Sequence, residues 1–193
     1  MAGDWGRKDQ SDLAIEKILE AAEKAFVELG VSAAGMAEIA HFAGCSRGTL
    51  YRYFKNRHEL HLAYVKHSSL SIQRVAHDRT KAIEDPRIRL VEFILCTIRQ
   101  VRENPATAAW FETGTSGLAA RMSRSAEVVE TLTSSFLPEH SDSHEGEAER
   151  VLRQRWLVRV VVSLLTEPAT SEAEERDFLV KFVVPVILVD ELH

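Results

Sequence analysis

The segment 40–57, AHFAGCSRGTLYRYFKNR, constrains the fold of this chain more than any other part of the sequence. Just before it, Met36 and Ile39 begin an apolar stripe at helical spacing. Gly44 is the residue type best able to take a left-handed conformation at the end of a helix. Ser46 offers a hydroxyl that can cap the first amides of a second helix. This order of a short helix, a glycine turn and a capped second helix predicts a helix-turn-helix.

The predicted second helix has two different faces. Leu50 and Phe54 are four residues apart and point inward, whereas Arg52 lies almost opposite them. Gly48 has no side chain, so another surface can approach the backbone closely. Residues 39–58 contain no acidic side chain, although the whole chain carries a formal net charge of −5. Such a local excess of cations suits the phosphates of a nucleic-acid backbone.

The outward residues of this segment are therefore candidate DNA contacts. Phosphate binding requires cations at fixed positions, and hydroxyl groups donate hydrogen bonds to phosphate oxygens. The second helix of such a motif enters the major groove of a duplex. The predicted contacts are Ser46, Arg47, Gly48, Thr49, Tyr51, Arg52, Tyr53, Lys55 and Arg57.

This part of the chain resembles the tetracycline-repressor (TetR) family of transcriptional regulators. The resemblance covers about residues 12–60 and extends loosely to the rest of the chain as a similar order and length of helices. The residues that carry it are Ile39-Ala40, Ala43-Gly44, the run 46–54, Arg57 and Leu60. It implies operator-binding roles for the matching positions Arg47, Gly48, Tyr51, Arg52, Tyr53 and Arg57.

The sequence departs from the family pattern at two places. Ala34-Gly35 stands where the family usually has a Thr or Ser that caps the first helix of the motif. We expect this change to lose a cap worth ~1 kcal/mol, and with it a phosphate contact. Cys45 replaces the usual aliphatic residue before Ser46. Neither departure removes the second helix of the motif.

The composition favours an all-α fold with about nine helices, because glycines and prolines are few and no long β-branched alternation occurs. The polar N-terminus lacks the apolar region of a secretion signal. The longest apolar run, 182–189, contains Pro185 and is far shorter than the ~20 residues of a membrane span. We therefore expect a cytoplasmic protein. The predicted parts are a flexible N-terminal arm (1–11), a helix-turn-helix DNA-binding domain (12–58, motif about 35–54) and an effector-binding and dimerisation domain (59–193).

Helix punctuation places the remaining helices. Gly30 ends a first helix near 12–29, and Asn56 begins a long helix that runs toward residue 83. Pro86 suits the first turn of the next helix, near 86–103. The later elements are a short helix with Trp110 and Phe111, helices at about 118–136, 146–165 and 172–192, and a polar loop at 138–146.

The last two predicted helices are apolar on more than one side. In the first of them, one face carries Leu152 and Trp156 and another carries Leu157 and Val161. A helix of this kind must be covered on more than one side, and a two-fold dimer is the commonest solution. The family resemblance likewise implies a homodimer in which the last two helices of each subunit form a four-helix bundle. The alternative is an internal core helix.

The family resemblance also implies an effector cavity among the helices between the DNA-binding domain and the dimer helices. An aromatic and aliphatic lining would suit a small lipophilic ligand. Arg99, Arg121 and Arg159 are candidates to anchor an anionic end of that ligand. The alternative is that the lining residues are plain core. The candidate ligand contacts are Phe93, Thr97, Trp110, Phe111, Met122 and Trp156.

The cysteines, the histidines and a search for catalytic motifs give little evidence of a redox, metal-binding or catalytic function. Cys45 could act as a redox sensor in the motif turn, but free cysteines are usually buried apolar residues, and we interpret Cys45 and Cys96 in that way. His58 and His61, like the loop pair at 140 and 144, have ligand-like spacing without a third ligand nearby. We interpret them as surface histidines and expect no metal or cofactor. No motif of a hydrolase or a phosphate-binding loop occurs, so we expect no enzyme.

The sequence thus predicts a homodimeric transcriptional repressor that a small lipophilic ligand releases from a palindromic operator. Two alternatives stay open. One is a DNA-binding regulator that responds to no ligand. The other is an all-α interaction domain whose basic helix docks on an acidic protein.

Overall fold

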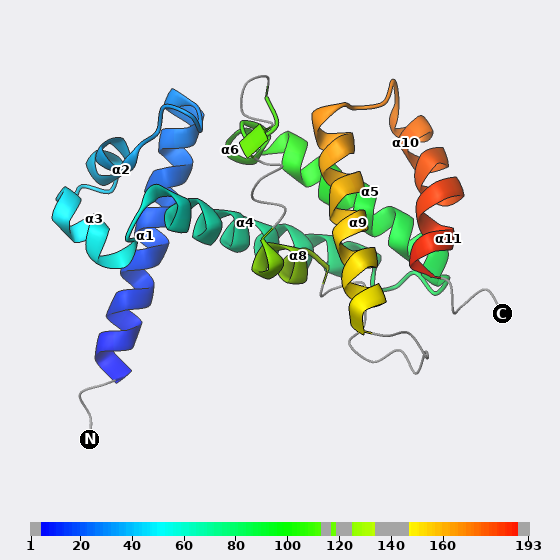
Figure 1. Ribbon diagram of the computed structural model, residues 1–193, viewed down its shortest axis with the longest axis horizontal. Helices are drawn as coiled ribbons and strands as arrows, with labels where there is room; N and C mark the ends of the chain where they lie inside the picture. The colour runs from blue at the N-terminus through cyan, green and yellow to red at the C-terminus, as the bar shows by residue number, and fades with distance from the viewer. Residues whose placement is uncertain (1–4, 113–116, 119–124, 134–146, 189–193) are drawn as a thin grey trace. The chain divides into compact units, whose positions relative to one another are not determined.

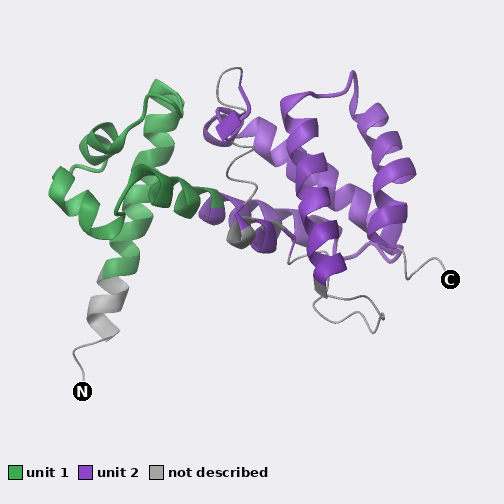
Figure 2. Ribbon diagram, viewed as in Figure 1, with its two compact units in different colours: residues 1–65 green, residues 66–193 purple. Residues whose placement is uncertain are grey.

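The computed structural model describes residues 5–112, 117–118, 125–133 and 147–188. All elements within these ranges are helical (Figure 1), which confirms the all-α prediction. The chain forms two compact units, residues 1–65 and 66–193 (Figure 2). The division falls inside α4 (Arg57–Thr80), seven residues beyond the predicted domain boundary after residue 58.

The first unit contains α1 (Trp5–Leu29), α2 (Met36–Phe42), α3 (Arg47–Tyr53) and the first turns of α4. Each helix contributes a side chain to one apolar core. These side chains, which are at most 2% exposed, are Phe26, Ile39, Leu50, Leu60 and Tyr64. α1 begins at Trp5, inside the segment 1–11 that the sequence analysis assigns to an N-terminal arm.

The turn between α2 and α3 is closed by the glycine that the sequence singles out. Gly44 has a φ of 62°, in the left-handed region. Its amide donates to the carbonyl of His41 over 3.0 Å, and the Cys45 amide donates to the carbonyl of Ala40 over 3.0 Å. This pair of bonds is the Schellman motif, which ends a helix by satisfying its last carbonyls. The predicted helix-turn-helix is therefore present.

The start of α2 is weakened less than the sequence suggests. Gly35 occupies the N-cap position with an extended backbone, and glycine there costs only a few tenths of a kcal/mol relative to serine. The carboxylate of Glu38 reaches back and accepts a hydrogen bond from the Gly35 amide over 3.1 Å. The expected loss of ~1 kcal/mol is thus too large.

The second unit contains the rest of α4, together with α5 (Pro86–Glu103), α6 (Pro105–Ala108), α8 (Ala126–Thr133), α9 (Glu147–Thr166), α10 (Glu172–Phe178), a π-helical segment η1 (Leu179–Val183) and α11 (Val184–Ile187). The carboxylate of Asp85 caps α5 by accepting from the Arg87 amide over 2.8 Å, with Pro86 in the first turn. Asn104 caps α6 in the same way, accepting from the Ala106 amide over 2.8 Å.

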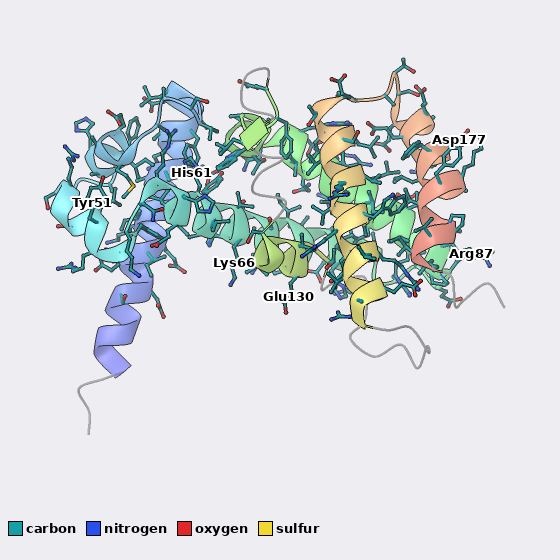
Figure 3. All side chains as sticks on the ribbon, in the orientation of Figure 1. Tyr51, His61, Lys66, Arg87, Glu130 and Asp177 are labelled. Carbon is teal, nitrogen blue, oxygen red and sulfur yellow. The ribbon has the colours of Figure 1, made fainter. Side chains whose placement is uncertain are left out.

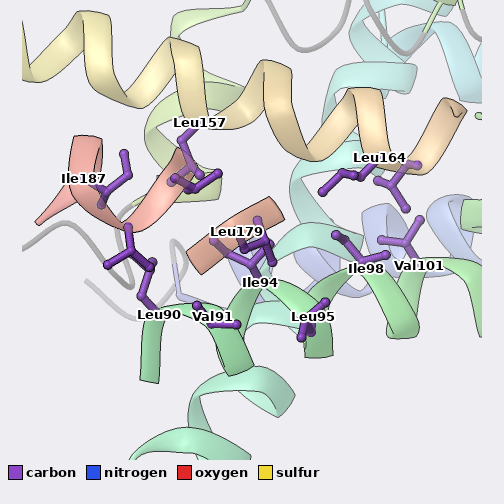
Figure 4. Close-up of a cluster of buried hydrophobic side chains, with 13 residues drawn as sticks. Leu90, Val91, Ile94, Leu95, Ile98, Val101, Leu157, Leu164, Leu179 and Ile187 are labelled. Carbon is purple, nitrogen blue, oxygen red and sulfur yellow. The ribbon is translucent and has the colours of Figure 1, made fainter. Parts of the chain in front are cut away.

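The core of this unit lies between α5, α9 and the helical run formed by α10, η1 and α11, here called the last helical run. Figure 4 shows apolar side chains from all three meeting in one cluster. Its most deeply buried members include Ile94 and Ile98 of α5, Leu157 of α9 and Leu179 of η1. The α10, η1 and α11 segments follow one another without a break from Glu172 to Ile187. The expected helix from 172 is therefore present.

The π-helical segment has a local cause. Pro185 has no amide hydrogen, and its ring would clash with the carbonyl four residues earlier in a regular helix. The turn before it is accordingly widened, so that the Val184 amide donates to Leu179, five residues back. The wider turn keeps Leu179, Val183 and Ile187 on the buried side.

Candidate nucleic-acid interface

The outer face of α3 has the orientation that the sequence predicts. Leu50 is fully buried and Phe54 is 6% exposed, so both point into the core of the first unit. Tyr51 is 43% exposed and is marked on α3 in Figure 3. The predicted contacts that are exposed are Ser46, Arg47, Gly48, Tyr51, Arg52 and Lys55, while Thr49, Tyr53 and Arg57 are half-buried.

Ser46 positions the start of α3. Its hydroxyl oxygen accepts a hydrogen bond from the Thr49 amide over 3.0 Å, which is the N-cap contact that the sequence predicts. The two hydroxyls of Ser46 and Thr49 are also hydrogen-bonded to each other over 2.9 Å. These bonds fix the first turn of the helix, and hence the direction in which Arg47 and Gly48 are presented.

Arg52 is held in place by its neighbour. Its guanidinium carbon lies 5.2 Å from the centroid of the Tyr53 ring, and its Nη2 donates to the Tyr53 hydroxyl over 3.4 Å. A cation over an aromatic face gains about 0.5–1 kcal/mol at an exposed site. Arg52 is therefore partly ordered before any contact forms, which lowers the entropy cost of placing it on a base or a phosphate.

The acidic residues that border the basic segment are both used in helix caps. Glu38 accepts from the Gly35 amide. Glu59 accepts from the Lys55 amide over 3.0 Å, and its own amide donates to the Asn56 side chain over 2.9 Å. Both carboxylates are thus engaged by backbone amides, and the segment 39–58 between them, which carries the exposed cations of α3 and Lys55, has no acidic side chain.

Arg57 is placed differently from the other predicted contacts. Its Nη2 donates to the backbone carbonyls of Val31 and, over 2.8 Å, Ser32. Its Nε donates to Nε2 of His61 over 3.4 Å. The guanidinium thus holds the loop between α1 and α2. The geometry favours a structural role over the direct DNA contact that the sequence predicts.

The interpretation of His61 as a surface histidine is wrong. Its side chain is 3% exposed and meets the Phe26 ring edge-on, with 5.5 Å between centroids. Burial, aided by the charges of Arg57 and His58, lowers the pKa of His61 from 6.5 to about 4. In the described part of the chain no cluster of three metal-binding side chains occurs. His140 and His144 lie outside it.

Both cysteines are free thiols. Cys96 is 5% exposed and packs with Ala76 and Phe93 in a small apolar cluster, as the sequence predicts. Cys45 is half-buried beside the motif turn.

The predicted ligand contacts belong to more than one cluster. Phe93 packs with Ala76 and Cys96, and the Thr97 hydroxyl donates to the Phe93 carbonyl of its own helix over 2.9 Å. Phe111 and Trp156 pack against the cluster between α5 and α9. Trp110 is 3% exposed, while Met122 and Arg121 lie outside the described residues. The effector cavity therefore stays a prediction, and Arg99 already pairs with Glu172 over 3.1 Å.

A substitution at Gly48 tests directly whether DNA approaches the backbone of α3 closely. A Cβ added there would meet only the Ser46 hydroxyl oxygen, at 3.8 Å, which is ordinary contact. We expect Gly48→Ala to leave the urea midpoint unchanged or slightly raised, because alanine favours helices. It should nevertheless weaken duplex binding about tenfold in a fluorescence-anisotropy titration, if the DNA backbone approaches this position. Equal affinity of Gly48→Ala and the wild type would place the duplex elsewhere.

The last helical run, α10–η1–α11, has several exposed apolar side chains. The exposed fractions are 39% for Phe178, 51% for Val180, 57% for Phe182 and 39% for Val186. The rings of Phe178 and Phe182 are 5.5 Å apart and border a shallow hollow, which Asp177 and Lys181 also line. On α9, Leu152 is 64% exposed. Within the described residues no helix is long and apolar enough to cross a membrane.

Comparison with known proteins agrees with this geometry. Residues 18–64 match the profile of the family described as "Bacterial regulatory proteins, tetR family". The chain is 40% identical to the uncharacterized HTH-type transcriptional regulator Rv1255c of Mycobacterium tuberculosis over 188 residues, which cover 97% of this chain and 92% of that protein.

Solved structures share the fold. The TetR family repressor AlkX from Dietzia sp. matches with a TM-score of 0.58 and 21% identity over 91% of this chain and 96% of its own. RolR without ligand matches with a TM-score of 0.60 and 16% identity over 90% of this chain and 95% of its own.

Proposed function

Because the chain belongs to the TetR family of transcriptional regulators, we propose that it is a homodimeric repressor that a small lipophilic ligand releases from a palindromic operator. The observation that carries the DNA-binding part is the outer face of α3. Arg47 and Arg52 are exposed there and Lys55 is exposed just after the helix, whereas Leu50 and Phe54 anchor the segment in the core. A short helix with this arrangement fits a major groove.

The exposed apolar side chains of the last helical run support the dimer. Phe178, Phe182 and Val186 recur every four residues and are each more than a third exposed, and an apolar patch of this kind marks an interaction site. A second copy of the same surface covers it under two-fold symmetry. Two copies of α3 then address two half-sites, separated by one helical turn of DNA (about 34 Å) or a multiple of it. Sedimentation equilibrium of the purified chain tests this state, and a monomer at micromolar concentration would contradict it.

Ligand control would act through α4, which contributes residues 57–65 to the first unit and residues 66–80 to the second. A ligand releases DNA only if it binds one conformation of the dimer more tightly than another. We propose that ligand bound in the second unit shifts α4 and thereby the separation of the two α3 helices. Equal operator affinity with and without a compound that stabilises the protein would favour the ligand-independent regulator.

The DNA-binding proposal predicts specific losses. Tyr51→Ala and Arg52→Ala should each weaken binding by about 1–3 kcal/mol, or roughly 5–150-fold, because each removes an outward contact. The probe is a duplex that the wild-type protein selects from a random-sequence pool. Both variants should keep the wild-type urea midpoint, since these side chains are exposed.

Arg87→Ala is the matched control. Arg87 is an exposed cation of α5 in the second unit (Figure 3), so its loss changes the net charge by the same amount without touching α3. Arg87→Ala should leave the affinity for the selected duplex within about twofold of the wild-type value. If the wild type binds no duplex with steep salt dependence, phosphates are not the target, and an acidic protein partner becomes the better explanation of the basic helix.

A further inference from the structure

We infer that Arg57 is a positioning residue, which ties the first turn of α4 to the α1–α2 loop and so fixes how the helix-turn-helix is presented to DNA. This inference rests on the proposed DNA-binding function. It assigns to Arg57 a role different from a phosphate contact. The observation behind it is the set of bonds from its guanidinium to the carbonyls of Val31 and Ser32 and to His61.

The backbone carbonyls of Val31 and Ser32 require hydrogen-bond donors, and a guanidinium supplies them. Gly30 ends α1 with a left-handed φ of 78°, so Val31 and Ser32 follow the helix without helical partners for their carbonyls. Val31 is fully buried, and a buried carbonyl that lacks a hydrogen bond destabilises the folded state. A cation near the C-terminal end of α1 is also favoured by the dipole of that helix.

The loop that Arg57 holds leads directly into α2. The amides of Ala33 and Ala34 both donate to the Gly30 carbonyl, over 3.2 and 3.1 Å, so the loop is a single compact turn. Ala34 is fully buried and precedes the N-cap residue Gly35. Fixing this loop to the start of α4 therefore fixes the start of α2, to which α3 is joined by the Gly44 turn.

His61, on the next turn of α4, provides the third acceptor for the Arg57 guanidinium. Its buried ring accepts the Nε hydrogen of Arg57 over 3.4 Å and rests on Phe26 of α1. Two nitrogens of the guanidinium, Nη2 and Nε, thus make three hydrogen bonds to protein acceptors. The planar fork of arginine suits such a set, and an ammonium group does not reproduce it.

The salt dependence of binding separates positioning from phosphate contact. A side chain that neutralises one phosphate contributes about 0.9 to the slope of log affinity against log salt concentration. A positioning residue contributes nothing to that slope. It lowers instead the ratio between the affinity for a specific duplex and the affinity for random DNA, because random DNA tolerates a displaced helix.

The test uses the full chain as wild type, R57Q, R57K and R52A. Each is titrated with the duplex that the wild type selects and with a random-sequence pool, between about 50 and 200 mM salt. We expect R57Q to lower the specific-to-random ratio about tenfold at an unchanged slope. R57K should lower it about threefold, since one ammonium can reach the carbonyls but lacks the Nε donor. R52A should reduce the slope by about 0.9.

Circular dichroism and urea unfolding establish that each variant is folded at the titration temperature. A merely structural Arg57 would lower the unfolding midpoint and leave the ratio of the folded protein unchanged, which would overturn the inference. A slope reduced by about 0.9 in R57Q would assign a phosphate contact and overturn it as well. If R57Q does not fold, R57K decides: a wild-type ratio refutes positioning, and a lowered ratio at unchanged slope supports it. Failure of the wild type to prefer its selected duplex would refute the proposed function itself.

Discussion

Replacing Arg102 with leucine is expected to lower the free energy of unfolding by about 3 kcal/mol, at the lower end of the range for breaking a buried ion pair. Glu175 of α10 is 1% exposed. Its carboxylate accepts two bonds from Arg102 of α5, over 2.6 and 3.1 Å. Arg102 also donates to the Leu164 carbonyl at the end of α9 over 2.9 Å. The substitution leaves a buried carboxylate without its cation, whereas the one-third exposure of the arginine moderates the loss.

The same two helices supply the control. Arg99 and Glu172 also form a bidentate pair, but their side chains are 41% and 49% exposed, so Arg99→Leu should cost less than about 1 kcal/mol. Urea unfolding followed by circular dichroism measures both. The double variant Arg102→Leu/Glu175→Leu should recover much of the loss, because it removes the stranded charge. Equal effects of Arg99→Leu and Arg102→Leu would show that burial does not set the strength of these pairs.

Acidification from pH 6.5 to 4 should remove about 3 kcal/mol of stability through His61 alone. The pKa of this imidazole is about 4 in the folded chain, against 6.5 when unfolded. Between those values the unfolded state binds a proton that the folded state does not, so stability falls as the pH falls. From about one pH unit above 6.5 both states are neutral there, and this residue then contributes almost no slope. Protonation also removes the acceptor that Arg57 uses.

The measurement is the free energy of unfolding of wild type and His61→Leu at several pH values from 7.5 to about 4. Carboxylates and the other histidines contribute to both proteins, so the difference between the two curves isolates His61. That difference should level off at about pH 7.5 and change by up to about 1.4 kcal/mol per pH unit between about pH 6 and 4.5. Parallel curves for wild type and His61→Leu would mean that the pKa of His61 is the same in the folded and unfolded states.

The helix-turn-helix could be predicted from sequence because its signals are local. Gly44 ends α2 in a left-handed conformation, and Ser46 caps α3 through the Thr49 amide. The inward direction of Leu50 and Phe54 follows from their spacing of four. Each of these features depends on residues within about one helical turn, so chain order alone specifies them.

The roles of Arg57, His61 and Glu175 could not be predicted from local sequence signals. In sequence, Arg57 looks like one more cation of a basic segment, His61 like a surface histidine, and Glu175 like one carboxylate among several in an acidic stretch. Their partners are 26, 35 and 73 positions away, at Val31, Phe26 and Arg102. The predicted ligand contacts stay a prediction, and sequence could not show that Phe93 and Trp156 pack in different clusters, because that too depends on distant neighbours.

The amino-acid order by itself determined the helical class of the chain, its family and the outward cations and phenols of α3, because helix periodicity and capping are short-range. Only the tertiary structure decided which polar side chains are buried, because burial depends on neighbours brought from distant positions. Packing places Arg57 against the α1–α2 loop, makes His61 a neutral hydrogen-bond acceptor and makes Glu175 one partner of a buried ion pair.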